Sequence, residues 1–148
     1  MKIFIDTNII MELLENRKQA DIVDEIFLAS EKYRWNKYIS VGSFYTLTYL
    51  TERMLHHNNY TFPELLNLQR SILGDILSAF SISPLSADLL LRGVEDDRFK
   101  DLEDSYQHKA AMHSNCDCIL TLNCEDYKQV NDILIVSPEA FKQQYLAM

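Results

Sequence analysis

Short apolar runs alternate along the chain with longer stretches in which apolar residues recur every three or four positions. Short runs of this kind are typical of β-strands, and the longer stretches have the spacing of amphipathic helices. The short runs predict strands at residues 2–5, 38–41, 80–82, 118–122 and 133–136.

The longer stretches predict helices between these strands. Ser86 is a good residue type for a helix N-cap, and Pro63 and Pro138 suit the first turn of a helix. The predicted helices cover residues 9–16, 20–32, 43–57, 63–77, 86–95, 102–114 and 138–146.

Strands that are separated by helices need crossover connections, which are right-handed and join parallel strands. A mainly parallel sheet is covered by helices on both faces, so the order of the elements predicts an α/β fold. The length of 148 residues suits one core, and we find no internal repeat and no linker. We therefore expect residues 1–148 to form a single domain, with residues 57–61 as the one candidate hinge.

Composition indicates where the protein acts. No apolar run approaches the roughly 20 residues that cross a bilayer, and the N-terminus does not have the pattern of a signal peptide. The three cysteines are few, odd in number and clustered, which is typical of reduced thiols. We therefore expect a cytoplasmic protein with no membrane partner.

The formal net charge of −8 disfavours nonspecific binding of nucleic acids, because phosphate contacts normally come from a basic surface. The charge does not exclude an enzyme that acts on nucleic acids through an acidic site filled with cations.

Acidic and amide side chains follow two of the predicted strands. Asp6 comes directly after the first strand, and Asn123 and Asp126 come after the strand at residues 118–122. In open parallel sheets, ligands bind outside the carboxyl ends of the strands. We therefore expect these side chains to share one pole of the sheet.

A third acidic group lies in residues 96–104. Asp97, Asp101 and Asp104 have i, i+4, i+7 spacing and would share one face of a helix. The helix dipole favours acids at a helix start. This explains Asp96 and Asp97 as solvent-exposed residues without a functional role. Asp104 lies deeper in the predicted helix and is the stronger candidate for chemistry.

Carboxylates that gather at one pole repel each other, by about 3 kcal/mol for two charges about 5 Å apart. A fold tolerates this when a cation lies between them, and Mg²⁺ and Mn²⁺ prefer oxygen ligands. Such ions activate water and stabilise charge on a phosphate. The pattern therefore favours metal-dependent hydrolysis of phosphodiesters, which requires no Cys or His.

Four motifs, at residues 3–10, 101–104, 121–127 and 136–141, follow one another in an order that resembles that of PIN domains. Residues 3–10 resemble the opening motif of that family, and Asp101-Leu102-Glu103-Asp104 resembles its third acidic motif. Residues 121–127 resemble the fourth motif, Thr-x-Asp/Asn-x-x-Asp-aromatic, and residues 136–141 resemble the closing strand and Pro-x-x-Phe helix. Over its whole length, the chain resembles the PIN-domain toxin ribonucleases of VapBC-type toxin–antitoxin pairs.

The resemblance implies a three-layer α/β/α sandwich with a mainly parallel sheet of about five strands. It also implies cleavage of single-stranded RNA with Mg²⁺ or Mn²⁺, and an antitoxin as partner. In this chain, Thr7 and Asn8 would orient Asp6, and Asn123 would help to position water or metal. The implied catalytic residues are Asp6, Asp104, Asp126 and Asn123, and the implied metal ligands are Asp6, Asp104 and Asp126.

The chain departs from the family pattern at two positions. Thr46 lies where family members often carry a Glu, and the nearest acid, Glu52, is nearly two helical turns further on. Asn123 replaces a strict carboxylate, and Asp101 is a candidate for supplying the missing charge.

Two other functions stay open. A PIN fold without the usual Glu is also compatible with a catalytically inactive binding module. An aspartyl phosphotransferase or phosphatase would also place Asp6 after the first strand, but it usually needs a second Asp where this chain has Asn8. Zinc binding is disfavoured because the spacing of His108, His113, Cys116, Cys118 and Cys124 is irregular.

The helices at residues 9–32 and 43–57 carry more apolar and aromatic positions than one face hides. We therefore expect a groove or patch for an amphipathic antitoxin segment or for a second copy of the chain in a homodimer. The residues on which this rests are Met11, Leu14, Phe27, Phe44, Tyr45 and Tyr49. Stacking on RNA bases is an alternative role for the aromatic residues Tyr33, Trp35, Tyr45 and Tyr49.

Overall fold

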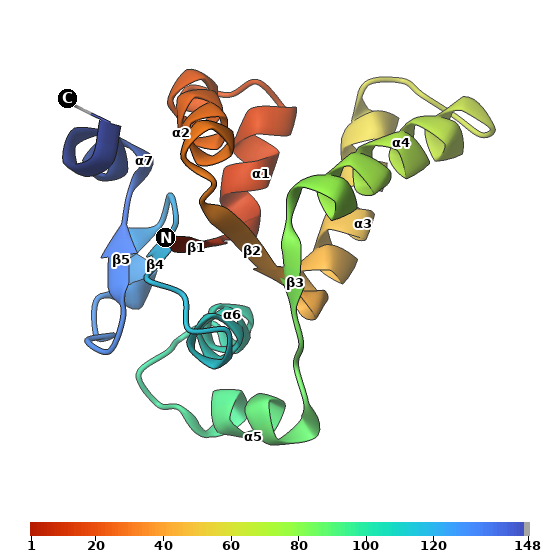
Figure 1. Cartoon of the computed structure of the whole chain (residues 1–148). Helices are drawn as coiled ribbons and strands as arrows, with labels where there is room; N and C mark the ends of the chain where they lie inside the picture. The colour runs from red at the N-terminus through yellow and green to blue at the C-terminus, as the bar shows by residue number, and fades with distance from the viewer. Residues whose placement is uncertain (147–148) are drawn as a thin grey trace.

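The computed structural model describes residues 1–146, in which one sheet has the strand order β3-β2-β1-β4-β5 (Figure 1). Every neighbouring pair of strands is parallel. The predicted strands are confirmed, with ends that shift by at most two residues. They are β1 (Lys2–Ile5), β2 (Asn36–Ser40), β3 (Ser81–Ser83), β4 (Cys118–Leu120) and β5 (Leu134–Val136).

The predicted helices are also confirmed. The first of them begins at Thr7 and not at residue 9, because Asp6 has an extended backbone and is itself the N-cap. None of the helices in residues 1–146 is long and apolar enough to cross a bilayer. They are α1 (Thr7–Leu14), α2 (Ala20–Tyr33), α3 (Val41–His57), α4 (Glu64–Ala79), α5 (Ala87–Glu95), α6 (Leu102–His113) and α7 (Pro138–Phe141), which the π-helical turn η2 (Lys142–Leu146) extends.

Alternate residues of the strands enter two apolar clusters, one on each face of the sheet. Ile3, Ile5 and Leu120 belong to the larger cluster, together with residues of α1 and α2. Phe4 and Ile119 face the other way and pack with two alanines of α6. Figure 1 shows α1 and α2 on one side of the sheet and α5 and α6 on the other, so the predicted three-layer α/β/α sandwich is confirmed.

The strand order reverses next to β1. The chain passes from β1 to β2 and β3 in one direction, and β4 and β5 then lie on the other side of β1. Ligands of parallel sheets bind at the carboxyl ends of strands beside such a reversal. The fold therefore places a candidate ligand site, which we call the crevice, at the ends of β1 and β4, where Asp6 and Thr121 follow the strands.

Asp96 and Asp97, in the loop before α6, were both expected to be solvated, and this is wrong for Asp96. Asp96 is partly buried and contacts Arg98 at 2.8 Å and Lys109 at 2.6 Å. The Arg98 guanidinium is the main reason why the pKa of Asp96 is well below its usual range, and Lys109 adds to it. Asp97, in contrast, is exposed as expected.

His108 on α6 is buried. The Lys109 ammonium donates to Nδ1 of His108 at 2.9 Å, so Nε2 carries the proton and donates to Asp132 at 2.8 Å. Burial lowers the pKa of His108, which keeps the ring neutral. These contacts tie the start and middle of α6 to the loop before β5.

Most of the predicted apolar patch belongs to the core. Met11 is buried, and Leu14, Phe27 and Phe44 pack partly buried against the larger cluster. Tyr45 and Tyr49 are different, since they are 72% and 60% exposed. Tyr33 and Trp35, at the end of α2, take part in an aromatic cluster. The ring of Trp35 packs against Tyr33, Phe141 and Tyr145.

Candidate active site

Asp6 lies at the carboxyl end of β1 and is only 4% exposed. Its Oδ2 atom accepts hydrogen bonds from Oγ1 of Thr121 at 2.7 Å and from Nδ2 of Asn8 at 3.3 Å. Asn8 also accepts a hydrogen bond from the backbone N–H of Leu122 at 3.3 Å. The residues after β1 and β4 therefore hold this carboxylate in one orientation.

Burial raises the pKa of Asp6, because a carboxylate that leaves water loses its hydration. Hydrogen bonds from Thr121, Gln107 and the backbone of Thr7 and Asn8 oppose this rise without cancelling it. The charged form of Asp6 would therefore be stabilised by a cation close to the carboxylate.

Asp104 is the second acid of the crevice, on the first turn of α6. Burial is the main reason that its pKa rises to about 7, and the negative charges of Asp6, Asp101 and Asp126 raise it further. Its Oδ1 accepts a hydrogen bond from the Tyr127 hydroxyl at 3.4 Å. Asp104 thus lies within the electrostatic field of three other carboxylates, which come from three separate parts of the chain.

Asp126 and Asn123 lie at the exposed rim of the crevice, on and just before the short 3₁₀ helix η1 (Cys124–Tyr127). The backbone N–H of Asp126 donates to the carbonyl of Asn123 at 3.0 Å, and the N–H of Asn123 donates to Oγ1 of Thr121 at 3.1 Å. Thr121 therefore links Asp6 to the segment that carries the rim acid.

Asp101 has a local role that its spacing did not reveal. It is the N-cap of α6, and its Oδ1 accepts from the backbone N–H groups of Glu103 at 2.8 Å and Asp104 at 3.3 Å. Because the helix begins only after Asp101, the acids at positions 97, 101 and 104 do not lie on one helical face, which corrects the predicted arrangement.

Gln107 is a buried residue of the crevice that the sequence analysis missed. Its Oε1 accepts from the backbone N–H of Thr7 and from the hydroxyl of Ser43, each at 3.4 Å. It thereby joins the starts of α1 and α3 to α6. Gln107 lies three residues after Asp104 and one turn before the buried Ala111, and this spacing was the available signal.

Thr46, at the position where the family resemblance places a Glu, faces an acid from another helix. Its Oγ1 donates to Oε1 of Glu103 on α6 at 2.9 Å. A carboxylate therefore lies beside this part of α3 after all, although it comes from a residue 57 positions away in the sequence.

Replacing Gln107 by Leu is expected to destabilise the fold by about 1–3 kcal/mol, because the buried N–H of Thr7 loses its acceptor. The free energy of unfolding in urea measures this. Gln143→Leu on the exposed surface of η2 is the control and should change stability little. Equal stability of wild type and Gln107→Leu would contradict the positioning role of this side chain.

The crevice offers oxygen ligands that suit Mg²⁺ or Mn²⁺. Asp6 and Asp104 supply two carboxylates with raised pKa, and Oγ1 of Thr7 is buried without a hydrogen-bond partner among residues 1–146. Within the same residues, no three side chains of His, Cys, Asp or Glu are grouped closely enough to enclose an ion. The arrangement therefore fits a hard ion that keeps several waters and meets few carboxylates, and it does not offer a thiolate or histidine site for zinc.

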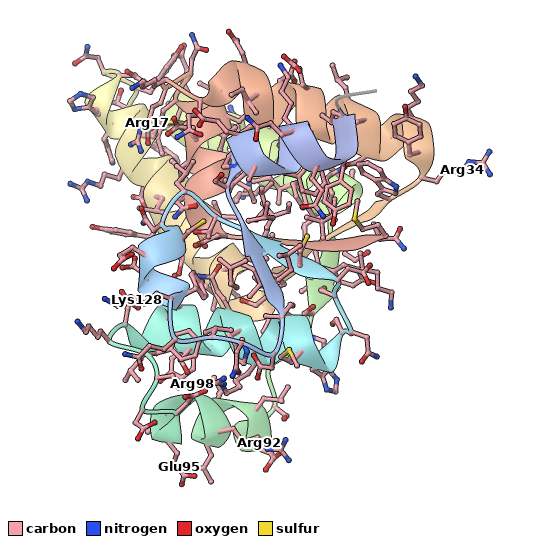
Figure 2. All side chains as sticks on the ribbon, turned by 90° about the vertical axis from the view of Figure 1, so that its left-hand side faces the viewer. Arg17, Arg34, Arg92, Glu95, Arg98 and Lys128 are labelled. Atoms are coloured by element: carbon pink, nitrogen blue, oxygen red, sulfur yellow. The ribbon has the colours of Figure 1, made fainter. Side chains whose placement is uncertain are left out.

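A cavity of about 220 Å³ adjoins this crevice between the loop before α6 and η1. Cationic side chains lie here beside the rim acids, and Figure 2 labels two of them, Arg98 and Lys128, on the same side of the molecule. The lining residues are Arg98, Lys100, Asp101, Glu125, Asp126, Lys128 and Gln129.

A comparison with protein-family models matches residues 2–125 to the PIN domain. The chain belongs to the PIN domain family. In this PIN domain, Asp104 lies within the electrostatic influence of two other motif acids that the resemblance identified, Asp6 and Asp126. No curated protein sequence matches this PIN domain.

Solved structures share the fold of this PIN domain at low sequence identity. VapBC2 from Rickettsia felis, bound to a DNA fragment from its promoter, has 17% identity and a TM-score of 0.70, covering 93% of this chain and 98% of that one. DNA-bound VapBC from Salmonella typhimurium has 16% identity and a TM-score of 0.69, covering 93% and 98%. A toxin–antitoxin complex from Klebsiella pneumoniae has 22% identity and a TM-score of 0.63, covering 91% and 96%.

Proposed function

We propose that this PIN domain is a metal-dependent endoribonuclease that cleaves single-stranded RNA and acts as the toxin of a toxin–antitoxin pair. The observation that carries the proposal is the pairing of a buried Asp6 with Asp104, whose pKa is raised to about 7 by burial and by the neighbouring acids. Such an arrangement stores repulsion that a divalent cation would relieve.

In this proposal Asp6 and Asp104 hold Mg²⁺ or Mn²⁺, and Asp126 and Asn123 complete the site from the rim. When bound, the ion supplies positive charge that activates a water molecule and offsets the charge of the phosphodiester. Thr121 and Asn8 keep the Asp6 carboxylate oriented through their hydrogen bonds. The hydroxyl of Tyr127 does the same for Asp104.

Thr46 stands in place of the usual Glu on α3, and its hydroxyl donates to the carboxylate of Glu103. We infer that Glu103 supplies the negative charge that the family resemblance implies on this side of the site. This favours the active enzyme over the inactive binding module. Asn8 forms hydrogen bonds with Asp6 and with the backbone of Leu122. It stands at the position where an aspartyl phosphotransferase needs a second Asp, which disfavours that alternative.

The toxin role rests on the shared fold with the VapBC and toxin–antitoxin complexes. We propose an antitoxin protein as the partner that keeps the nuclease inactive. A homodimer and a cytoplasmic location are part of the same proposal.

The test is cleavage of a labelled pool of single-stranded RNA by the purified chain, with Mn²⁺, with Mg²⁺ and with EDTA. We expect endonucleolytic products with either metal and none with EDTA, and much slower cleavage of duplex RNA and of single-stranded DNA. Cleavage that persists in EDTA would contradict the metal role. Binding of RNA without cleavage under every metal condition would favour the inactive binding module.

A further inference from the structure

One face of α3 carries exposed aromatic and cationic residues that the proposed chemistry does not use. Tyr45 and Tyr49 are 72% and 60% exposed, and Arg53 follows at the same spacing. Residues at i, i+4 and i+8 lie on one side of a helix, and each step of four advances by about 6 Å along the axis. The three side chains therefore form a continuous stripe, which we call the α3 stripe.

The α3 stripe ends at a cavity of about 860 Å³ between the C-terminal ends of α1 and α3. Arg17, Arg53, His56 and His57 line it, and Glu15 is its one acid. Arg17 is paired with Glu15 at 2.6 Å and His56 lies 3.8 Å from Glu52, whereas Arg53 forms no ion pair within residues 1–146. In a protein of net charge −8, the two arginines against one acid make this cavity locally basic.

The other end of the α3 stripe lies at the candidate active site. Thr46, next to Tyr45, donates to Glu103, and Ser43 donates to Gln107. Both acceptors are on α6, on either side of Asp104 in the sequence. The stripe therefore runs from the acidic crevice along α3 to the cationic cavity.

We propose that the α3 stripe is the track for single-stranded RNA that leaves the active site. Successive bases stack on Tyr45 and Tyr49, and backbone phosphates bind Arg53 and the cations of the cavity. Stacking accepts any base because every base has a flat face, and cationic side chains bind phosphates without regard to sequence. The inference rests on the proposed ribonuclease function and names the surface that holds its substrate.

RNA fits the α3 stripe better than a protein partner does, because the exposed rings are followed by Arg53 and because the stripe starts next to Thr46, which contacts the residue before Asp104. An antitoxin segment or a second copy of the chain would bury the rings by apolar contact alone. Replacing both tyrosines by leucine separates these cases, since leucine keeps apolar bulk and removes the flat ring.

The first experiment measures the Kd of a fluorescent single-stranded RNA of about 12 nucleotides by anisotropy in EDTA, so that binding does not depend on cleavage. We expect the Tyr45→Leu/Tyr49→Leu variant to bind at least about tenfold more weakly than wild type. The Tyr45→Phe/Tyr49→Phe variant keeps both rings and should bind like wild type. Phe62→Leu is the matched control, since Phe62 is 78% exposed in the loop between α3 and α4.

In wild type, Arg53→Ala should also weaken the binding of RNA, and it should reduce the dependence of Kd on salt concentration. Arg70→Ala, on the exposed surface of α4, is its control. Thermal melting checks that each variant is folded, and Arg53→Ala keeps the test valid if the leucine variant is not folded.

Equal Kd values for wild type, the leucine variant and Phe62→Leu would overturn the inference. The leucine variant could instead sediment as a monomer where wild type sediments as a dimer, with an unchanged Kd for RNA. That result would assign the α3 stripe to contact with a second copy and would also overturn the inference. If wild type still cleaves RNA in the metal assay in either case, the proposed function stands and only the RNA track fails.

Discussion

Replacing Asp6 by Asn is expected to lower the rate of RNA cleavage by at least about 100-fold, while the fold keeps its stability or gains some. Asparagine has nearly the same shape as aspartate, so the hydrogen bond from Thr121 Oγ1 has an acceptor in either side chain. The negative charge that would hold a divalent cation is lost, however. Since the interaction acts mainly in the transition state, the rate should fall far more than the affinity for RNA.

Single-turnover cleavage of one labelled RNA in Mn²⁺ measures this rate, and anisotropy measures the affinity. Asp97→Asn is the matched control, because it removes the same charge from an exposed position outside the crevice. Equal rates for Asp6→Asn and wild type would show that the cleavage comes from another site or a contaminant.

Replacing Asp104 by Asn is expected to have the second largest effect, a loss of cleavage of about 100-fold together with a change in how stability depends on pH. The raised pKa of about 7 means that the folded protein binds this proton more tightly than the unfolded chain does. The group's contribution to stability is therefore complete below the ordinary carboxyl pKa near 4, and it is lost as the pH rises through about 7.

Without metal, Asp104→Asn should therefore be more stable than wild type at about pH 8, by about 1–2 kcal/mol after allowance for solvent around this half-buried group. Near pH 4 the difference should be close to zero. Unfolding in urea with EDTA at both pH values measures it. Destabilisation of the same size at both pH values would mean that Asp104 has only a packing role.

Adding Mn²⁺ at about pH 8 should reverse this order, since a bound cation relieves the repulsion in wild type and the variant has lost a ligand. The thermal midpoint of wild type should rise with Mn²⁺ concentration, and that of Asp104→Asn should rise much less.

The parts of the fold that depend on local pattern could be predicted from the sequence. The two-residue alternation of Ile3, Phe4 and Ile5 places them on opposite faces of β1, as the two apolar clusters show. The rule that ligands bind at the carboxyl ends of parallel strands was enough to single out Asp6 and Asp126. The start of α1 shifted to Thr7 because Asp6, with its extended backbone, is the N-cap.

The parts that depend on which helices are neighbours in space could not be predicted. Glu103 and Thr46 are 57 positions apart, and Gln107 and Ser43 are 64 apart, so no local spacing signals these contacts. Asp96 similarly resembled a solvated acid, since one of its two cationic partners, Lys109, comes from the following helix. In each case a polar side chain is satisfied by tertiary contacts that the periodicity of the sequence does not encode.

The central claim is that Asp6 and Asp104 together hold a divalent ion that RNA cleavage requires. Calorimetric titration of Mn²⁺ into wild type and into the Asp6→Asn/Asp104→Asn variant, with RNA cleavage measured on the same samples, tests this most directly. We predict saturable binding to wild type, binding weaker by at least about tenfold in the variant, and cleavage that follows the occupancy of the site. Equal Mn²⁺ affinity of the two proteins, or cleavage by the variant at the wild-type rate, would contradict the claim.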